Sequence, residues 1–159
     1  MIRMPFGGLL LSTVLATVLA TVLVLPVRAE GDERMQLGAL GVVAEFQSEA
    51  GDRVFFAEGS AELGTRARAA LDAQAAWLRA HPSIAVTVEG HADDWGSARD
   101  NLEISQKRAA AVRERLIAGG VPAERIVTVA FGRTRRAADC AAPMCNAQNR
   151  RSITVPYPR

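Results

Sequence analysis

Asp93 and Arg108 are the two side chains of opposite charge whose placement best suits ligand binding. Asp93 lies in the stretch GHADDWG, directly after a predicted strand, and Arg108 lies about two turns into the helix predicted next. Loops at the carboxyl end of a strand that lead into a helix commonly form binding pockets. A carboxylate facing a guanidinium suits a zwitterion, because one takes an ammonium and the other forks onto a carboxylate. The same spacing also fits a salt bridge that only steadies the loop.

The helix after this loop carries a polar stripe. Its members recur at intervals of four, three and four residues, namely Asn101, Ser105, Arg108 and Val112. Residues at this spacing share one face of a helix. The stripe is therefore polar near the amino end of the helix and apolar further along.

His91, Asp93 and Asp94 could also indicate metal ligands or an acid–base cluster. The sequence offers no second histidine nearby and no nucleophile pattern, so we expect no catalytic residues, no metal, no cofactor and no enzymatic activity. We expect His91 to close the strand end and to hold the loop by hydrogen bonds. Trp95 fits a pocket wall, a partner contact or a simply exposed aromatic residue, and the sequence does not choose among these.

Hydrophobic periodicity predicts the elements that position these residues. The predicted strands span residues 54–56, 84–89, 126–131 and 152–155, and the predicted helices span 65–80 and 101–118. Asp100 and Glu103 form a predicted acidic capping box that opens the second helix. Trp77, at helical spacing with leucines, is predicted to lie in the core. Two amphipathic helices on one face of a mixed sheet predict an α/β (α+β) two-layer sandwich.

The amino-terminal segment, residues 1–29, reads as a secretory signal. An uncharged run over residues 9–25 is followed by small residues that suit cleavage after Ala29. The alternative is a retained membrane anchor, since the run is close to the length of a span. No cysteine lies near its end, so we do not expect an ordinary acylated lipoprotein. Residues 30–52 then form a linker or a short helix, and residues 53–159 form the folded domain.

Charge excludes two classes of partner. The chain has 19 Lys and Arg against 17 Asp and Glu, and removal of the leader leaves the two signs equal. We therefore expect neither nucleic-acid binding nor electrostatic membrane binding. Contact with a membrane is expected only through the amino-terminal segment, if it stays uncleaved.

The two cysteines, Cys140 and Cys145, lie close together in the segment DCAAPMCN, which we expect to be irregular. An exported protein meets an oxidising compartment, so the default prediction is a disulfide between them. A metal site is disfavoured, because there is no second cysteine pair and no histidine nearby in sequence. Closing so short a loop mainly stiffens it.

These motifs together resemble the OmpA-like peptidoglycan-binding domain family. The resemblance rests on GHADDWG, NLEISQKRAAAV and QNRR, and it runs from about residue 54 to residue 155. The family pattern Asn-x-x-Leu-Ser-x-x-Arg-Ala-x-x-Val-x-x-x-Leu is met by Asn101, Ile104 in place of Leu, Ser105, Arg108, Ala109, Val112 and Leu116. The resemblance implies a two-layer fold with a mixed sheet.

The resemblance also implies a site for diaminopimelate, the zwitterionic amino acid of the peptidoglycan stem. Asp93 and Arg108 match the contacting pair, Ala92 and Asn101 match neighbours in the motif, and Arg150 lies in the Asn-Arg-Arg element that borders the site.

The implied function is non-covalent binding of peptidoglycan, which tethers an envelope component to the wall. The implied location is the periplasm or cell envelope, in association with the outer membrane. An alternative is an interaction module whose main partner is a periplasmic protein such as TolB, with wall binding secondary. A wall-modifying enzyme is the third possibility.

Overall fold

The computed structural model describes residues 29–139 and 142–159, with residues 29–37 described as backbone only. Along the chain the elements are α1 (Ala29–Glu49), β1 (Arg53–Phe55), α2 (Thr65–Ala80), β2 (Ile84–Gly90), α3 (Ala98–Ala118), the 3₁₀ turn η1 (Ala123–Arg125), β3 (Ile126–Ala130), α4 (Pro143–Asn149) and β4 (Arg151–Pro158). The predicted leader lies outside the described residues except for Ala29, so its cleavage stays a prediction. Among the described residues, no helix has the length and hydropathy needed to cross a membrane.

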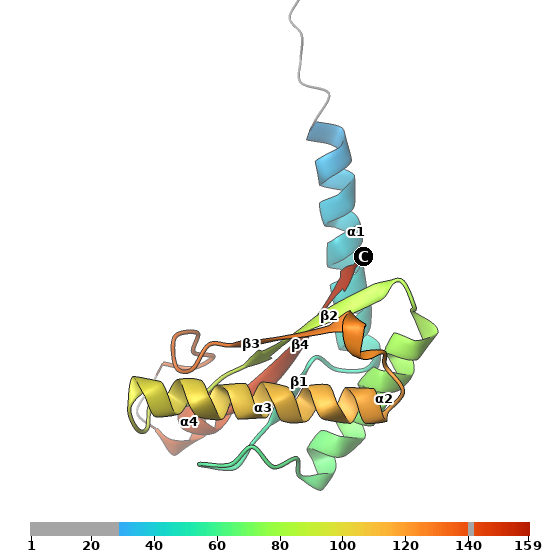
Figure 1. Ribbon diagram of the computed structural model, residues 1–159. Helices are drawn as coiled ribbons and strands as arrows, with labels where there is room; N and C mark the ends of the chain where they lie inside the picture. Colours follow the sequence, from blue (N-terminus) through green and yellow to red (C-terminus); the bar gives the residue numbers. More distant parts are fainter. Residues whose placement is uncertain (1–28, 140–141) are drawn as a thin grey trace, which may run out of the picture.

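The four strands form one mixed sheet in the order β1-β4-β2-β3. β2 pairs with β3 in parallel, and β4 lies antiparallel to both β1 and β2. The helices α2 and α3 pack against one face of the sheet, where their apolar residues and alternate residues of the strands build the core (Figure 1). The predicted α/β two-layer sandwich is therefore confirmed.

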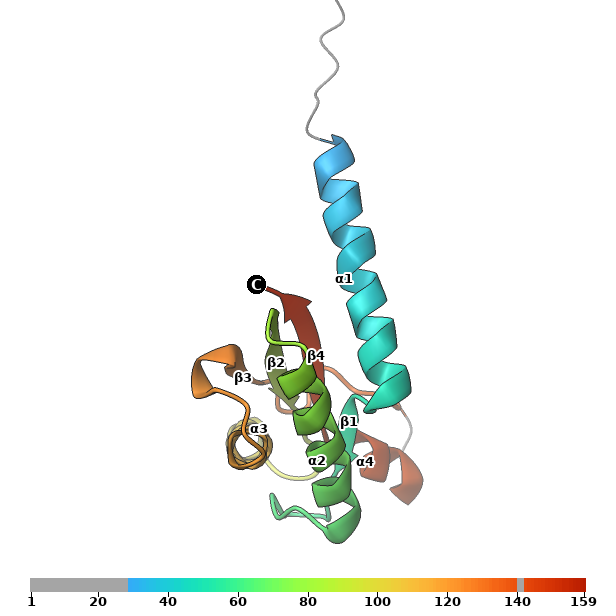
Figure 2. The same ribbon diagram turned by 90° about the vertical axis from the view of Figure 1, so that its right-hand side faces the viewer.

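The core also includes the carboxyl-terminal end of α1. Phe46 is fully buried and packs edge-on against Trp77 of α2, with 5.1 Å between the ring centroids. The Trp77 indole nitrogen donates to Glu49 at 3.1 Å, and only 7% of Trp77 is exposed, as predicted for a core residue. The amino-terminal turns of α1 project away from the domain (Figure 2). Residues 30–52, expected to form a linker or short helix, thus contain most of a helix of 21 residues.

The predicted capping box of α3 was wrong by one turn. Ser97 is the N-cap: its hydroxyl accepts from the Asp100 N–H at 3.1 Å, and its own N–H donates to the Asp100 carboxylate at 3.3 Å. Glu103 instead pairs with Lys107 at 2.7 Å on the surface of the helix. Ser97 is the N-cap because its extended backbone directly before the helix lets its side chain reach the free amides of the first turn.

The segment that we expected to be irregular contains the short helix α4. Pro143 stands in its first turn, where the missing N–H of proline costs nothing. Cys145 lies on this helix and is buried. The partner predicted for it, Cys140, lies outside the described residues, so the disulfide stays a prediction.

Gly90 lets α3 lie unusually close to the end of β2. A Cβ atom at this position would stand 1.9 Å from the carbonyl oxygen of Ser105, which no side chain tolerates. This close approach places the polar stripe of α3 beside the loop that follows β2.

Candidate ligand-binding site

A pocket of about 250 Å³ opens between this loop, the amino end of α3 and the segment after β1. Its lining consists of Glu58, Gly59, Asp93, Trp95, Gly96, Asp100, Asn101, Ile104 and Arg108. Three predicted site residues, Asp93, Asn101 and Arg108, therefore meet in one pocket. Ala92 and Arg150 do not line it. Ala92 is only 2% exposed, and Arg150, which directly precedes β4, bonds to Asp93 without lining the pocket.

Arg108 is held by backbone carbonyls. It is 1% exposed, and its guanidinium donates to the carbonyl oxygens of Ser60 (2.9 Å), His91 (2.9 Å) and Ala57 (3.2 Å). No carboxylate among the described residues forms an ion pair with it. Burial lowers the pKa of Arg108 to about 10, while the nearby charge of Asp93 opposes this effect. Arg108 therefore stays positive at neutral pH without a direct anionic partner.

The hydrogen bonds of Arg108 leave donors free. A guanidinium carries five N–H groups, and the three bonds use Nε and one N–H on each terminal nitrogen. One N–H on each terminal nitrogen remains. These two groups can fork onto a carboxylate that enters the pocket.

Asp93 forms its ion pair with Arg150. Arg150 Nη1 lies 3.0 Å from Asp93 Oδ2, and Arg150 Nε donates to the Phe56 carbonyl at 3.2 Å. A direct salt bridge between Asp93 and Arg108, considered as the loop-steadying alternative, does not form in the structure. Arg150, which directly precedes β4, pairs with the carboxylate instead. No hydrogen bond among the described residues uses Asp93 Oδ1, so this oxygen is available to an ammonium.

Asn101 contributes an unpaired donor. The residue is 3% exposed, yet its Nδ2 has no hydrogen-bond partner among the described residues. An unsatisfied buried amide costs about 1–3 kcal/mol. A ligand oxygen placed between Asn101 and Arg108 removes that cost.

His91 holds the loop through its backbone. Its N–H donates to the Arg151 carbonyl at 3.0 Å, and its carbonyl accepts from Arg108. The imidazole stacks on Phe131 at 5.5 Å between centroids and is 1% exposed. Burial, with a smaller effect from Arg151, lowers its pKa to about 4, so the ring is neutral at pH 7. The expected hydrogen bonds thus come from the main chain rather than from the ring.

Sequence reasoning missed several lining residues, among them Glu58, Asp100 and Ile104. Glu58 and Gly59 follow β1 closely, and Gly59 has a φ of +62°, so the chain turns sharply there. A glycine just after a predicted strand indicates a turn of the chain. Gly59 was therefore the sequence signal that could have located this second wall of the pocket. No group of three or more His, Cys, Asp or Glu residues that could hold a metal occurs in the part of the chain that the structure describes.

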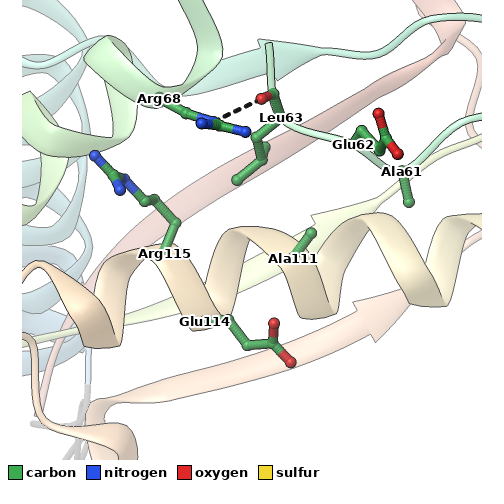
Figure 3. Close-up of a pocket in the computed structure, with 7 residues that line it drawn as sticks. All are labelled: Ala61, Glu62, Leu63, Arg68, Ala111, Glu114 and Arg115. Atoms are coloured by element: carbon green, nitrogen blue, oxygen red, sulfur yellow. Dashed lines mark hydrogen bonds between the residues drawn. The ribbon is translucent and has the colours of Figure 1, made fainter. Parts of the chain in front are cut away.

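A second hollow, of about 520 Å³, lies between α2, α3 and the segment before α2 (Figure 3). Its arginines already have partners. Arg68 donates to the Leu63 carbonyl at 2.8 Å, and Arg115 pairs with Asp72 at 2.6 Å. Arg115 Nε is unpaired as well, but its guanidinium already faces the carboxylate of Asp72. The smaller pocket is the better candidate, because its buried cation, Arg108, has no carboxylate partner among the described residues.

Comparison with known proteins agrees with the fold and with the predicted family. The model of the OmpA family matches residues 55–150, and the chain belongs to this family. A crystal structure of the peptidoglycan-associated lipoprotein from Burkholderia pseudomallei superposes with a TM-score of 0.64 at 31% identity, covering 66% of this chain and 89% of that one. The carboxyl-terminal domain of Helicobacter pylori MotB, at 20% identity and a TM-score of 0.64, shares the fold over 68% of this chain and 85% of that one.

Within the family, the chain is similar to the peptidoglycan-associated lipoprotein, Pal. Pal of Brucella melitensis is 41% identical over 127 residues, which is 79% of this chain and 76% of the relative. Pal of Rhizobium meliloti is 41% identical over 115 residues, or 72% of this chain and 65% of the relative. The predicted resemblance to the OmpA-like family is thereby confirmed.

Proposed function

We propose that this domain binds peptidoglycan non-covalently through the diaminopimelate of the peptide stem. One observation carries the proposal: Arg108 is a buried cation that lines a pocket with Asp93 and Asn101. Within the part of the chain that the structure describes, it keeps two free N–H groups and has no direct carboxylate partner. A buried charge is tolerated when a counter-charge satisfies it. The site is thus suited to a ligand that brings a carboxylate.

The ligand also needs an ammonium. Its carboxylate accepts from the two free N–H groups of Arg108 and from Asn101 Nδ2, and its ammonium donates to Asp93 Oδ1. Arg150 donates to the other oxygen, Oδ2, so the carboxylate of Asp93 is already oriented before the ligand arrives. Diaminopimelate carries both charged groups on one short chain, which matches this arrangement.

The similarity to Pal, whose name describes association with peptidoglycan, supports the same ligand. We place the protein in the cell envelope, in the periplasm and associated with the outer membrane, where it tethers an envelope component to the wall. The proposed role is binding without catalysis. A TolB-like periplasmic protein, implied by the resemblance, is retained as the alternative partner.

Co-sedimentation with purified sacculi tests the proposal. The wild-type protein should pellet with sacculi, and free diaminopimelate should release it. Asp93→Asn should weaken binding about thirtyfold or more, because truncating one member of a desolvated charged contact typically costs about 2–5 kcal/mol.

Asp94→Asn is the matched control. Asp94 is the adjacent carboxylate, but it pairs with Arg136 at 3.0 Å and does not line the pocket. This variant should sediment like the wild type. A folded Asp93→Asn protein with unchanged binding would contradict the pocket assignment, and release of soluble muropeptides would point to an enzyme instead.

A further inference from the structure

Trp95 is the large apolar side chain at the mouth of the pocket. It lines the same hollow as Asp93 and Arg108, yet 70% of it is exposed. An indole left in water forgoes the favourable burial that most tryptophans obtain. Its exposure is therefore a feature that a ligand can use.

The loop that carries Trp95 is anchored on both sides. Asp93 pairs with Arg150 at 3.0 Å, Asp94 pairs with Arg136 at 3.0 Å, and Ser97 caps α3 through its contacts with Asp100. Gly96, between Trp95 and the cap, has a φ of +87°, a conformation that side-chain-bearing residues rarely adopt. The structure thus anchors the backbone that carries the indole beside the pocket.

The pocket is too small for a complete muropeptide. Its volume of about 250 Å³ lies below the range of about 300–1,000 Å³ that is usual for drug-sized ligands. It can hold one amino-acid residue, and the remainder of the ligand must continue out of the mouth. Buried polar groups line the inside, whereas the apolar ring of Trp95 stands at the rim.

We propose that Trp95 contacts the part of the muropeptide that adjoins the bound diaminopimelate, and so extends recognition beyond that residue. This inference rests on the proposed function. The flat indole face suits the C–H surface of a neighbouring stem residue or of a sugar ring, and its N–H can donate to their oxygens. Anchoring on Arg108 and Asp93 then selects the zwitterion, while Trp95 selects what is attached to it.

Calorimetric titration with three probes tests the inference: free meso-diaminopimelate, a stem tripeptide ending in diaminopimelate, and the same tripeptide on its disaccharide. Trp95→Ala should weaken binding of the larger probes about five- to tenfold more than it weakens binding of free diaminopimelate. A loss already seen with the tripeptide places the contact on the stem, and a loss confined to the disaccharide probe places it on the sugar. Met144→Ala is the matched control, because Met144 is also 70% exposed and does not line the pocket.

Iodide quenching of tryptophan fluorescence gives a second readout. Trp95 is exposed, while Trp77, the other tryptophan, is 7% exposed, so quenching reports mainly on Trp95. The larger probes should protect it more strongly than free diaminopimelate does. Equal affinity losses for all probes, or no loss for any, would overturn the inference. If wild-type protein binds the larger probes but not free diaminopimelate, the proposed anchoring fails while the contact of Trp95 can still be read from its variant. If it binds none, both proposals fail.

Discussion

Arg108 and Arg125 are two buried arginines with similar bonding and different surroundings. Arg125, 4% exposed, donates to the carbonyl oxygens of Leu78 (2.9 Å), His81 (2.7 Å) and Ile84 (2.8 Å from Nε). These carbonyls belong to the end of α2 and the start of β2, so Arg125 ties the turn between them to η1. Arg108 likewise binds three carbonyls but faces the pocket.

The comparison separates a structural cation from one that we propose to bind a ligand. Burial and hydrogen bonding alone do not distinguish them, since both guanidiniums are desolvated and both pKa values are lowered by burial. The difference lies in the neighbours of Arg108, which are the unpaired amide of Asn101 and the carboxylate of Asp93. An arginine of this kind marks a site only where it shares a hollow with other unsatisfied groups.

The largest expected effect is on stability, at Arg125. Arg125→Met should lower the free energy of unfolding by about 3–5 kcal/mol, because it leaves several buried carbonyls without donors. Denaturant titration measures the change, and Arg99→Met, at an exposed position, serves as control. The protein that remains folded should still sediment with sacculi. A fully folded Arg125→Met variant that no longer binds sacculi would contradict the purely structural role of Arg125.

Acid should lower the free energy of unfolding through His91, whose carbonyl accepts a hydrogen bond from Arg108. His91 has a pKa of about 4 in the folded protein, against 6.5 for a free histidine. The unfolded chain therefore takes up a proton between these values and the folded chain does not, so stability present above pH 6.5 is lost as the pH falls towards 4. The loss should amount to about 2–3 kcal/mol. Denaturation of the wild type and of His91→Gln at pH 7 and pH 4 measures it, and equal losses in both proteins would refute it.

Arg108→Lys should lower affinity for sacculi about thirtyfold, or about 2 kcal/mol. A lysine is a point charge that reproduces neither the fork nor the bonds to three carbonyls. Arg125→Lys is the paired variant for the same sedimentation assay, and its folded fraction should keep wild-type affinity. Similar affinities for the two variants would contradict the different roles assigned to the two arginines.

The smallest effect is expected at the start of α3. Ser97→Ala removes the N-cap and should lower the free energy of unfolding by about 1 kcal/mol. Ser97→Asp, which can still cap, should restore it in thermal unfolding. The close approach of α3 to β2 at Gly90 and the packing of α3 in the core also position the polar stripe. Ser97→Ala should therefore change the affinity for sacculi by less than about tenfold. A larger drop would show that the cap itself positions the site.

Local patterns predicted most of the fold. The predicted helix over residues 65–80 coincides with α2, and β2 follows the alternation seen at residues 84–89. Both elements are amphipathic along their own length, so each pattern carries its own evidence. Helix α1 is different. Gly38 and Gly41, near its middle, weaken its helix propensity, and Phe46 near its end packs against Trp77 of another element.

Sequence patterns predicted which residues belong to the candidate site, but not which of them form ion pairs or hydrogen bonds with one another. Asp93, Asn101 and Arg108 lie near one another in sequence, on a loop and the helix that it opens. Arg150, by contrast, lies 57 residues from Asp93, so their ion pair depends on where β4 enters the sheet. The unpaired Nδ2 of Asn101 likewise depends on the whole surroundings of the side chain.

Gly90 has a consequence for how this sequence can vary. Its hydrogen atom occupies the space where a methyl group would meet the Ser105 carbonyl at 1.9 Å, so even alanine would push α3 away from β2. Such a shift would move Arg108 and Asn101 together, although position 90 touches no ligand. Substitution is therefore sterically restricted at this small, chemically inert residue, although it does not line the pocket. A lineage that lost the glycine would need a compensating change in α3 before its site could work again.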